Sequence, residues 1–275
     1  MPALLCTPPS APLPSPLPVR TAIISDIHAN LAALTTVLAH IDGNAVDRII
    51  CLGDVVGYGP DPVECVDLVA ARCEWSLMGN HDFGVLYEPT NFNPAAEQAA
   101  FWTRTQFEKR DDDRELAIKR WQFLGRLRVR VAFDNFLCVH GTPRRPINEY
   151  LFPEDAVNSP VKMQQVFDRI DRFCLVGHTH VPGVFTDEPD FYPPQDVDGV
   201  YTFSENEKAI VNPGSVGQPR DLDPRASYAI LEQPVEGPAR VEFFRLEYDV
   251  KSTVDKILAI PELSDWLGER LYEGR

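Results

Sequence analysis

The sequence predicts an α/β fold in which a parallel or mixed β-sheet is faced by helices. Short apolar runs alternate with helical patterns over residues 19–82, which is the strand–loop–helix repetition of such folds. The chain from residue 183 onward reads mainly as strands. The early apolar runs end in polar residues that include Asp, Asn and His. Because ligands of open α/β sheets bind at the carboxyl ends of the strands, we expect a functional site at this edge.

The first part of the chain supplies three predicted strands and two predicted helices. The strands are expected at 21–24, 49–52 and 74–78, where the apolar runs are too short for full helices. Between them, Asn30 can serve as the N-cap of one helix and Pro62 can occupy the first turn of another. Apolar residues recur at helical spacing in both: Leu31, Leu34, Leu38 and Ile41, then Val63, Val66 and Val69.

Residues 84–128 change character and predict a helical insertion over the active-site edge of the sheet. Two helical stretches, 95–110 and 115–127, are separated by the charged run 110–114. Since the protein is acidic, we interpret the aromatic residues of these helices as a packing surface rather than a platform for stacking bases. These residues are Trp102, Phe107, Trp121 and Phe123.

The remainder of the chain is predicted to be richer in strands. A β-hairpin is expected at 129–133 and 136–139, followed by a helix over 161–170 and a strand over 172–176. The loop 212–221 is too rich in Gly and Pro for regular structure. Further strands are expected at 200–203, 208–211, 227–231 and 240–248, and two closing helices at 250–259 and 261–272.

Composition and charge disfavour several classes of protein. The 275 residues include 26 Lys and Arg against 41 Asp and Glu, a formal charge of −15, so duplex nucleic acid and anionic membranes are unexpected partners. No apolar run reaches transmembrane length.

The six cysteines form no CxxC pair, which indicates buried thiols in a reducing cytoplasm. Residues 1–18 are expected to be a disordered, proline-rich tail, and 19–275 a single domain. The sequence carries no signal for the oligomeric state.

The histidines are concentrated where apolar runs end. Five of the six histidines stand there beside Gly, Asp or Asn, and only His40 lies within a helical pattern. Packing does not explain these five together with Asp26, Asp54 and Asn80. Mixed imidazole, carboxylate and amide ligands suit Mn, Fe or Zn better than Mg or Ca, and two such ions can hydrolyse phosphoesters. The five histidines are His28, His81, His140, His178 and His180.

Five short blocks in this region resemble the calcineurin-like metallophosphoesterases. Each block is a weak signal alone, but all five occur here in the order that the family has, over residues 26–180. The family pattern is DxH, GDxxG, GNHD, a histidine before glycine, and GHxH. Here it reads Asp26-Ile27-His28, Gly53-Asp54-Val55-Val56-Gly57, Gly79-Asn80-His81-Asp82, His140-Gly141 and Gly177-His178-Thr179-His180.

The resemblance implies a four-layer αββα sandwich with two mixed β-sheets and a dinuclear metal centre. In the family a bridging hydroxide attacks phosphorus, and the residue matching His81 assists the leaving group as a general acid or a positive charge. Mn is favoured, with Fe, Zn and Ni also compatible. The implied ligands are Asp26, His28 and His180 for the first metal, Asn80, His140 and His178 for the second, and Asp54 for both.

Departures from the family pattern bear on the substrate. Protein phosphatases of this superfamily continue as GDxVDRG, whereas Gly57, Tyr58 and Gly59 stand here, so the Asp that orients the catalytic His and the phosphate-binding Arg are missing. The chain is more similar to a bacterial single-domain, phosphodiesterase-like branch. The partner of His81 can be Asp82 or a residue distant in sequence.

Groups that contact phosphate must then come from elsewhere. Arg145 and Arg220 are the candidates, with Arg144 beside the first, although each arginine can equally pair with a surface carboxylate. Tyr58 can stack on a base or an aryl leaving group, or simply pack. Asn212 and Ser215 can hydrogen-bond His178 or His180, or simply form a turn.

The function predicted from these residues is dinuclear metal-dependent hydrolysis of a phosphoester, either a small molecule or a nucleotide. A phosphodiester is favoured because the protein-phosphatase Arg is absent and the insertion can close over one substituent. A phosphomonoesterase and a dinucleoside polyphosphate hydrolase are the alternatives. A non-catalytic metal-binding scaffold is disfavoured because His81 and all seven ligands are intact. A DNA nuclease is disfavoured by the charge of −15.

Overall fold

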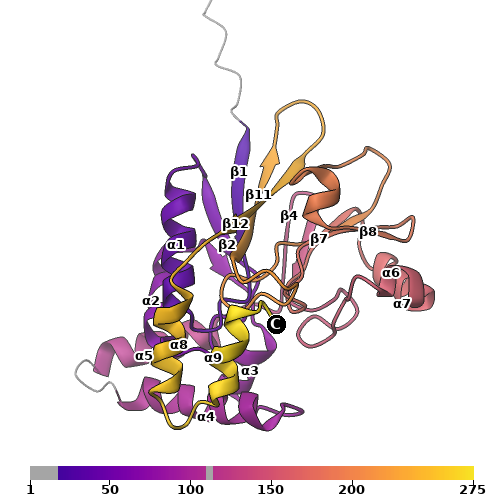
Figure 1. Ribbon diagram of the computed structural model, residues 1–275. Coiled ribbons are helices and arrows are strands. Elements are labelled where there is room, and N and C mark those ends of the chain that lie inside the picture. The colour runs from indigo at the N-terminus through magenta and orange to yellow at the C-terminus, as the bar shows by residue number, and fades with distance from the viewer. Residues whose placement is uncertain (1–17, 110–113) are drawn as a thin grey trace, which may run out of the picture.

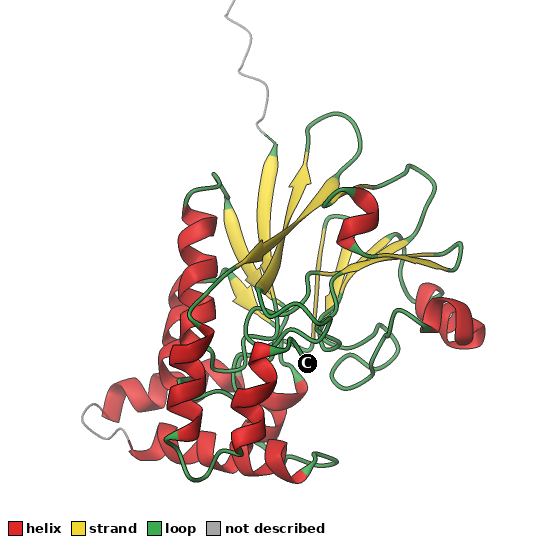
Figure 2. Cartoon of the chain, in the orientation of Figure 1, coloured by secondary structure: helices red, strands yellow, loops and turns green. Residues whose placement is uncertain are grey.

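Two six-stranded sheets lie face to face with helices on their outer sides (Figures 1 and 2). The computed structural model describes residues 18–109 and 114–275. The predicted proline-rich tail, apart from its last residue, and nearly all of the charged run 110–114 lie outside these ranges. The expected αββα sandwich with two mixed sheets is confirmed.

The first sheet holds the early strands of the chain. Strands β1, β2 and β3 are parallel to one another, and Ile23 lies opposite Ile50. β11 pairs antiparallel with β1 and continues the sheet through β12 and β9. The order is β3 (Trp75–Ser76), β2 (Arg48–Cys51), β1 (Val19–Ile24), β11 (Ala226–Gln233), β12 (Arg240–Leu246) and β9 (Val200–Thr202).

The second sheet is also mixed. Its middle strands β5, β6 and β10 are parallel, and the flanking strands are antiparallel. The predicted hairpin is present, with Phe133 opposite Phe136 and Asp134 at a positive φ of 47°. The order is β4 (Arg130–Phe133), β5 (Phe136–Val139), β6 (Phe173–Leu175), β10 (Ala209–Asn212), β7 (Gly183–Thr186) and β8 (Asp190–Tyr192).

The core consists of three apolar layers that follow the two-residue period of the strands. Ile23 and Ile50 point into the space between the sheets, where they meet Phe136 and Phe173 of the other sheet. Their neighbour Ile24 points to the opposite face and packs with the helices. A third cluster joins the outer face of the second sheet to its own helices. Burial on both faces explains why these strands read as continuous apolar runs.

Helices cover both outer faces of the sandwich. The outer face of the first sheet is covered by α1 (Leu31–Asp42) and α2 (Pro62–Arg72), and α8 (Val250–Leu258) packs on α1. Below the ends of the strands, this layer continues with α3 (Asn80–Leu86), α4 (Pro94–Lys109) and α5 (Arg114–Gly125). The chain ends with α9 (Asp265–Glu269) and the 3₁₀ turn η2 (Arg270–Tyr272). The second sheet is covered by α6 (Asp155–Asn158) and α7 (Pro160–Phe167), and η1 (Pro194–Val197) precedes β9.

Several element boundaries differ from the predictions. The last helix begins at Asp265 rather than near Pro261, because residues 261–263 form a turn. The third strand is reduced to two residues, and the segment after it is helical: α3 starts at Asn80, where a loop was expected. Asp82 occupies the third position of this helix and accepts a hydrogen bond from the Gly79 N–H at 3.0 Å. Such an acidic residue is an N-terminal helix signal.

The insertion continues the helical layer and also reaches the site. Helix α5 packs on α2, where Arg120 forms an ion pair with Asp67 at 2.6 Å. The start of α4 borders the main cavity through Asn93 and Ala96. The aromatic residues of the insertion are buried or partly buried in the apolar clusters, as expected of a packing surface: Trp102, Phe107, Trp121 and Phe123.

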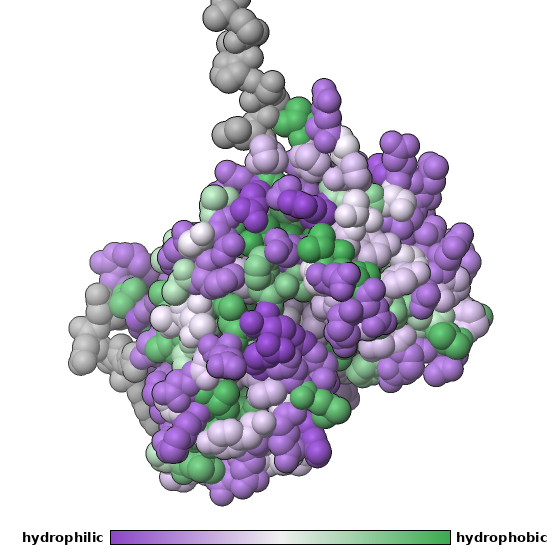
Figure 3. Space-filling view, turned by 45° about the horizontal axis from the view of Figure 1, so that its top comes forward, coloured by the Kyte–Doolittle hydropathy of each residue, from purple (hydrophilic) through white to green (hydrophobic). Residues whose placement is uncertain are grey.

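The surface agrees with the composition. On the face shown in Figure 3, hydrophilic residues predominate and hydrophobic ones lie in small scattered groups. Within residues 18–109 and 114–275, no helix combines the length and the apolar character needed to cross a bilayer. The five cysteines of these ranges are free thiols, and four of them are buried.

Candidate metal centre

The predicted ligands follow the carboxyl ends of strands from both sheets. Asp26 and His28 come after β1, and Asp54 comes after β2. Asn80 opens α3 just beyond β3, while the second sheet contributes His140 after β5 and the GHxH segment after β6. Because β1, β2 and β3 run parallel, as do β5 and β6, their ends meet at one edge of the sandwich.

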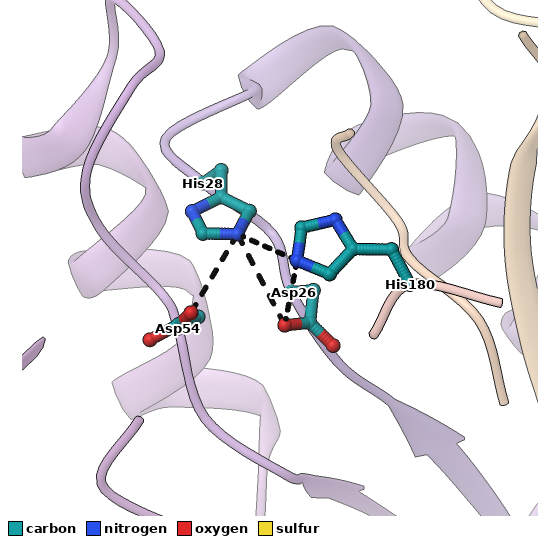
Figure 4. A group of neighbouring side chains, drawn as sticks. All are labelled: Asp26, His28, Asp54 and His180. Carbon is teal, nitrogen blue, oxygen red and sulfur yellow. Dashed lines mark hydrogen bonds and ion pairs between the residues drawn. The ribbon is translucent and has the colours of Figure 1, made fainter. Parts of the chain in front are cut away.

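A first group of four buried side chains surrounds His28. Figure 4 shows its imidazole facing Asp26, Asp54 and His180. The Nε2 atom of His28 lies 3.2 Å from His180 Nε2 and 3.6 Å from Asp54 Oδ2. His180 Nε2 is 3.2 Å from Asp26 Oδ1. Each of the four residues offers one ligand atom, and these four atoms all lie within 4.8 Å of one another. That spacing is short enough for all four to bind one metal ion.

A second group shares Asp54 with the first. Asp54, His140 and His178 offer ligand atoms within the same limit of 4.8 Å. His140 Nε2 lies 3.3 Å from Asp54 Oδ2 and 3.3 Å from Asn80 Oδ1. The same carboxylate oxygen, Asp54 Oδ2, therefore faces both groups. All seven predicted ligands are brought together, and their binding of metal stays a prediction.

The donor set fits two cations. Asp54 Oδ2 and His178 Nε2 are buried and have no hydrogen-bond partner in the part of the chain that the structure describes. A buried polar atom without a partner costs about 1–3 kcal/mol, so such atoms point to a missing ligand. A cation at each group would satisfy both atoms.

Main-chain carbonyls orient three of the histidines. The Nδ1 atom of His140 lies 2.9 Å from the Leu52 carbonyl oxygen, and that of His180 lies 2.5 Å from the carbonyl of Gln218. His28 Nδ1 is 3.3 Å from the Val56 carbonyl. A carbonyl only accepts, so Nδ1 carries a proton in all three rings. The neutral rings of His28 and His180 therefore present an Nε2 lone pair to the cluster, which is the form that binds a metal, and His140 would take this form when a cation displaces its second proton.

Burial and charge adjust the protonation of these groups. Burial lowers the pKa of His178 to about 3 and that of His28 well below its ordinary value, so both imidazoles are neutral. Burial acts in the same direction on His140, but the Asp54 carboxylate outweighs it and raises the pKa to about 9. The pKa of Asp54 is lowered in turn: burial raises it, and His140 and the other histidines prevail.

The ligand loops hold an unusual backbone conformation. Five of the seven predicted ligands have a positive φ, a region that non-glycine residues seldom adopt and that costs roughly 1–3 kcal/mol each. Hydrogen bonds between the loops impose it: the Asp26 N–H donates to the Gly53 carbonyl at 3.0 Å, and the His28 N–H to that of Asp54 at 3.0 Å. The five are Asp26 (53°), His28 (49°), Asp54 (53°), His178 (67°) and His180 (62°).

A family model confirms what this geometry indicates. The calcineurin-like phosphoesterase superfamily domain matches residues 19–234. The chain belongs to this superfamily. Membership implies a phosphoester hydrolase that uses divalent metals, as the sequence predicted.

Individual relatives cover nearly the whole calcineurin-like chain. An uncharacterized protein of Methanocaldococcus jannaschii is 38% identical over 261 residues, which is 92% of this chain and 98% of that protein. The crystal structure of a metallophosphoesterase from Sphaerobacter thermophilus is 38% identical, with a TM-score of 0.75 over 94% of this chain and 100% of that one. A hypothetical protein from Pyrococcus horikoshii is 18% identical and shares the fold, with a TM-score of 0.69 over 94% and 99% of the two chains.

Asp82 of the calcineurin-like GNHD block braces the metal loops and does not pair with His81. Its carboxylate accepts hydrogen bonds from the N–H groups of Asp54 at 2.8 Å, Val55 at 3.0 Å and Val56 at 3.3 Å, besides the one from Gly79. Of the two partners that the sequence left open for His81, Asp82 is therefore the wrong one.

His81 stands beside the metal ligands with a free ring nitrogen. Its imidazole lies 4.2 Å from the Tyr58 ring, 4.7 Å from Phe92 and 4.8 Å from His28. Its Nδ1 atom is buried without a partner among the described residues, and burial lowers the pKa of His81 to about 4. Gly57 makes room for the ring, since a Cβ at that position would lie 2.4 Å from Nδ1.

Asn212 and Ser215 hold main chain rather than histidine rings. Asn212 Nδ2 donates to the Gly177 carbonyl at 2.8 Å and to Thr179 Oγ1 at 2.7 Å. Ser215 Oγ donates to the Asp26 carbonyl at 2.7 Å. Of the two possibilities that the sequence left open, the structural turn is the one present: the loop 212–218 supports the backbone on which the predicted ligands stand.

A cavity of about 580 Å³ opens beside the metal groups. His81, Asn80 and His178 form its floor, and aromatic side chains from three segments form much of its wall: Tyr58, Phe83, Phe92 and Tyr150. The Tyr150 ring stacks on His178 at 3.8 Å. Sequence reasoning missed Phe92 and Tyr150. The one sequence feature that could have indicated Tyr150 is its position in the loop that begins with the predicted ligand His140.

The predicted phosphate-contacting residues occupy different places. Arg145 lines the cavity, whereas Arg144 forms an ion pair with Glu149 at 2.5 Å. Arg220 does not belong to the cavity lining, and its guanidinium lies 5.9 Å from the centre of the Tyr58 ring. The Tyr58 ring itself packs on His81 and His28.

Proposed function

We propose that the protein is a dinuclear metal-dependent hydrolase of phosphodiesters. The observation that carries the proposal is Asp54 Oδ2, a buried carboxylate oxygen without a hydrogen-bond partner in the described chain that faces both ligand groups. A shared carboxylate of this kind holds two ions at the short separation that two-metal hydrolysis requires. Mn is the favoured metal, and the nitrogen–oxygen donor set also suits Fe, Zn or Ni.

Two bound ions would polarise the phosphoryl oxygens and provide a nucleophile from water. The protein's own part is to position them through Asp26, His28 and His180 at one site, and through Asn80, His140 and His178 at the other. His81 lies beside these ligands on the cavity floor. Burial keeps this imidazole neutral in the free protein, so its N–H would stabilise the leaving oxygen of a substrate whose leaving group enters the cavity. The negative charge of a bound phosphoester would favour the protonated ring that can act as an acid.

The cavity supports an aromatic or nucleoside leaving group. Its volume of about 580 Å³ and its aromatic wall suit a planar group. Apart from histidine, the charged lining residues are Arg145 and Glu88, one of each sign. A polyphosphate chain would need more positive charge there, so the cavity favours a singly charged phosphodiester over a dinucleoside polyphosphate.

Hydrolysis of two model substrates tests the proposal. Bis-p-nitrophenyl phosphate and p-nitrophenyl phosphate are compared with metal-free and Mn-loaded protein, using the wild type, Asp54→Asn and the control His40→Gln. His40 lies away from the centre and contacts Tyr228, so this variant keeps its activity. We expect Mn-dependent turnover that prefers the diester and is lost in Asp54→Asn.

Two other outcomes have defined meanings. Preference for p-nitrophenyl phosphate would make the protein a phosphomonoesterase. If the wild type with two bound metals turned over neither model substrate, nor cyclic nucleotides, nor dinucleoside polyphosphates, the proposal would fail and a metal-binding scaffold would take its place.

A further inference from the structure

The C-terminal turn is fastened beside the loop that carries Arg220. The Leu222 N–H donates to the Gly274 carbonyl at 2.9 Å. Gly274 has a φ of +65°, and a Cβ there would lie 2.6 Å from the Asp223 nitrogen, so the two backbones are in close contact. Figure 1 shows the C-terminus beneath the sheets, among the loops at their carboxyl edge. The segments 270–274 and 220–223 therefore lie side by side.

The same turn packs against the residue that borders His81. Leu267 and Leu271, on either side of Arg270 in sequence, belong to the apolar cluster of Tyr58. Both leucines, Tyr58 and Gln218 also line one small void. Gln218 in turn accepts a hydrogen bond from Arg220 Nη2 at 2.8 Å. Arg270 and Arg220 therefore stand on two segments that both pack beside Tyr58.

Neither guanidinium has an acidic side chain as partner. Among the residues that the structure describes, no Asp or Glu lies within 4 Å of Arg220 or Arg270, and Arg220 Nε is buried without any hydrogen-bond partner. Arg270 Nε donates to an oxygen of Arg275, and its guanidinium lies over the Trp266 ring at 4.3 Å, which fixes its position and leaves both terminal nitrogens for a ligand. By contrast, the nearby Arg225 pairs with Asp223 at 2.6 Å.

Placing the partly buried guanidinium groups of Arg220 and Arg270 close to each other, without a counterion, destabilises the folded protein. Burial lowers the pKa of Arg270 to about 10, and the charge of Arg220 acts in the same direction. The pair persists in a protein whose formal charge is −15 and which has many carboxylates to spare. The Arg275 oxygen partners only Nε of Arg270. Because partly buried charges normally have a counterion, an anion at the remaining guanidinium nitrogens would complete this cluster.

We propose that Arg220 and Arg270 form a paired-guanidinium subsite beside Tyr58 for the phosphoryl oxygens of the substrate. The planar fork of arginine suits two oxygens of one phosphoryl group. The identity of the anion as a phosphoester rests on the proposed function. Arg270 lies outside residues 19–234, which the family model matches, so this contact belongs to the C-terminal extension of the domain.

Binding of inorganic phosphate tests the subsite without turnover. Isothermal titration calorimetry of the Mn-loaded protein is compared for the wild type, Arg270→Gln and Arg275→Gln. The second variant is the matched control: it removes the same charge from the same turn, where Arg275 pairs with Glu273 at 3.0 Å. We expect Arg270→Gln to bind phosphate about tenfold more weakly, the effect of losing one hydrogen bond to a charged group. Wild-type affinity in Arg270→Gln would overturn the proposal.

A second variant separates loss of the subsite from loss of the fold. Arg270→Lys keeps the charge and loses the fork, and we expect phosphate affinity between those of the wild type and Arg270→Gln. Metal content and melting temperature are measured for each variant, and titrations are made where circular dichroism shows the protein folded. Arg270→Lys binding as weakly as Arg270→Gln, with a lowered metal content in both, would also overturn the proposal.

Failure of the phosphate subsite and failure of the proposed hydrolase activity give different results. Arg270-dependent phosphate binding in a protein that hydrolyses no phosphoester would leave the subsite standing and refute the enzyme. Hydrolysis with unchanged phosphate affinity in Arg270→Gln would refute the subsite alone.

Discussion

His81 is set apart from the metal ligands by having a ring nitrogen without a partner in the described chain. We predict that His81→Asn lowers kcat by about 10²–10⁴, the usual contribution of a group that transfers a proton to or from the reacting atoms. Metal content should stay at the wild-type value, because the main-chain N–H of His81, and not its ring, contacts Asp54 at 2.8 Å. Elemental analysis alongside kinetics checks both. A kcat loss that follows a loss of metal would contradict the role.

Gly57 determines the space in which His81 sits. We predict that Gly57→Ala lowers turnover strongly, because the new methyl group would lie 2.4 Å from His81 Nδ1 and the residue has a φ of +88°. Gly125→Ala is the control, since a Cβ there meets nothing within 4 Å. Kinetics and thermal melting of both variants test this. Equal activity of the two would show that the position of His81 does not matter.

The proximity of the proposed metal ligands could be predicted because each stands directly after an apolar run, and a parallel sheet brings such positions together. His28 and Asp54 are 26 residues apart in sequence, yet the lateral pairing of β1 and β2 alone explains their contact. Arg270 and Tyr150 could not be predicted in this way. Their place in the site depends on how the C-terminal turn and a long loop fold back, which no local pattern encodes.

Helix α3 depends on Asp82 for its connection to the metal loops. We predict that Asp82→Ala lowers the free energy of unfolding by more than about 3 kcal/mol, because four main-chain donors would lose a buried acceptor. The control is Asp249→Ala at the start of α8, where one side-chain hydrogen bond to the Ser252 N–H at 3.0 Å is lost. That change should cost about 1 kcal/mol. Urea unfolding measures both, and similar losses would contradict the bracing role of Asp82.

Most helices and strands could be predicted because the spacing of their apolar residues clearly matches a helix or a strand. The helix from Leu31 and the hairpin around Asp134 follow directly from apolar spacing and a turn. Helix α3 was missed because its seven residues carry the GNHD block, whose polar residues look like a loop. Asp82 at the third position of α3 was the sequence feature that could have indicated the start of this helix.

The molecule as a whole should be more stable with metal than without. Five ligands held at positive φ and two buried atoms without partners raise the free energy of the metal-free protein. We predict that Mn at 100 times its dissociation constant stabilises the fold by about 2.7 kcal/mol per ion, or on the order of 5–10 °C. Differential scanning calorimetry with and without a chelator checks this. Asp54→Asn should lose most of the increase, and an equal increase in that variant would exclude shared ligation.

The α/β character of the molecule followed from the alternation of strands and helices, but the stacking of two sheets did not. The four-layer arrangement was implied only by the family resemblance. Physically, it arises because Ile23 and Phe173 lie on strands whose opposite faces are both apolar, and nothing in either strand specifies which partner covers each face.

The position of the C-terminal turn has a practical consequence for handling the protein. A tag, fusion partner or surface linkage placed after Arg275 would begin beside Arg270 and the loop of Arg220. Val19, at the amino end of β1, is separated from Asp26 by the length of a six-residue strand, roughly 20 Å. Attachment before Val19 therefore keeps a fused partner away from Arg270 and Arg220, whereas a C-terminal fusion would crowd these two arginines and weaken phosphate binding by an otherwise intact protein.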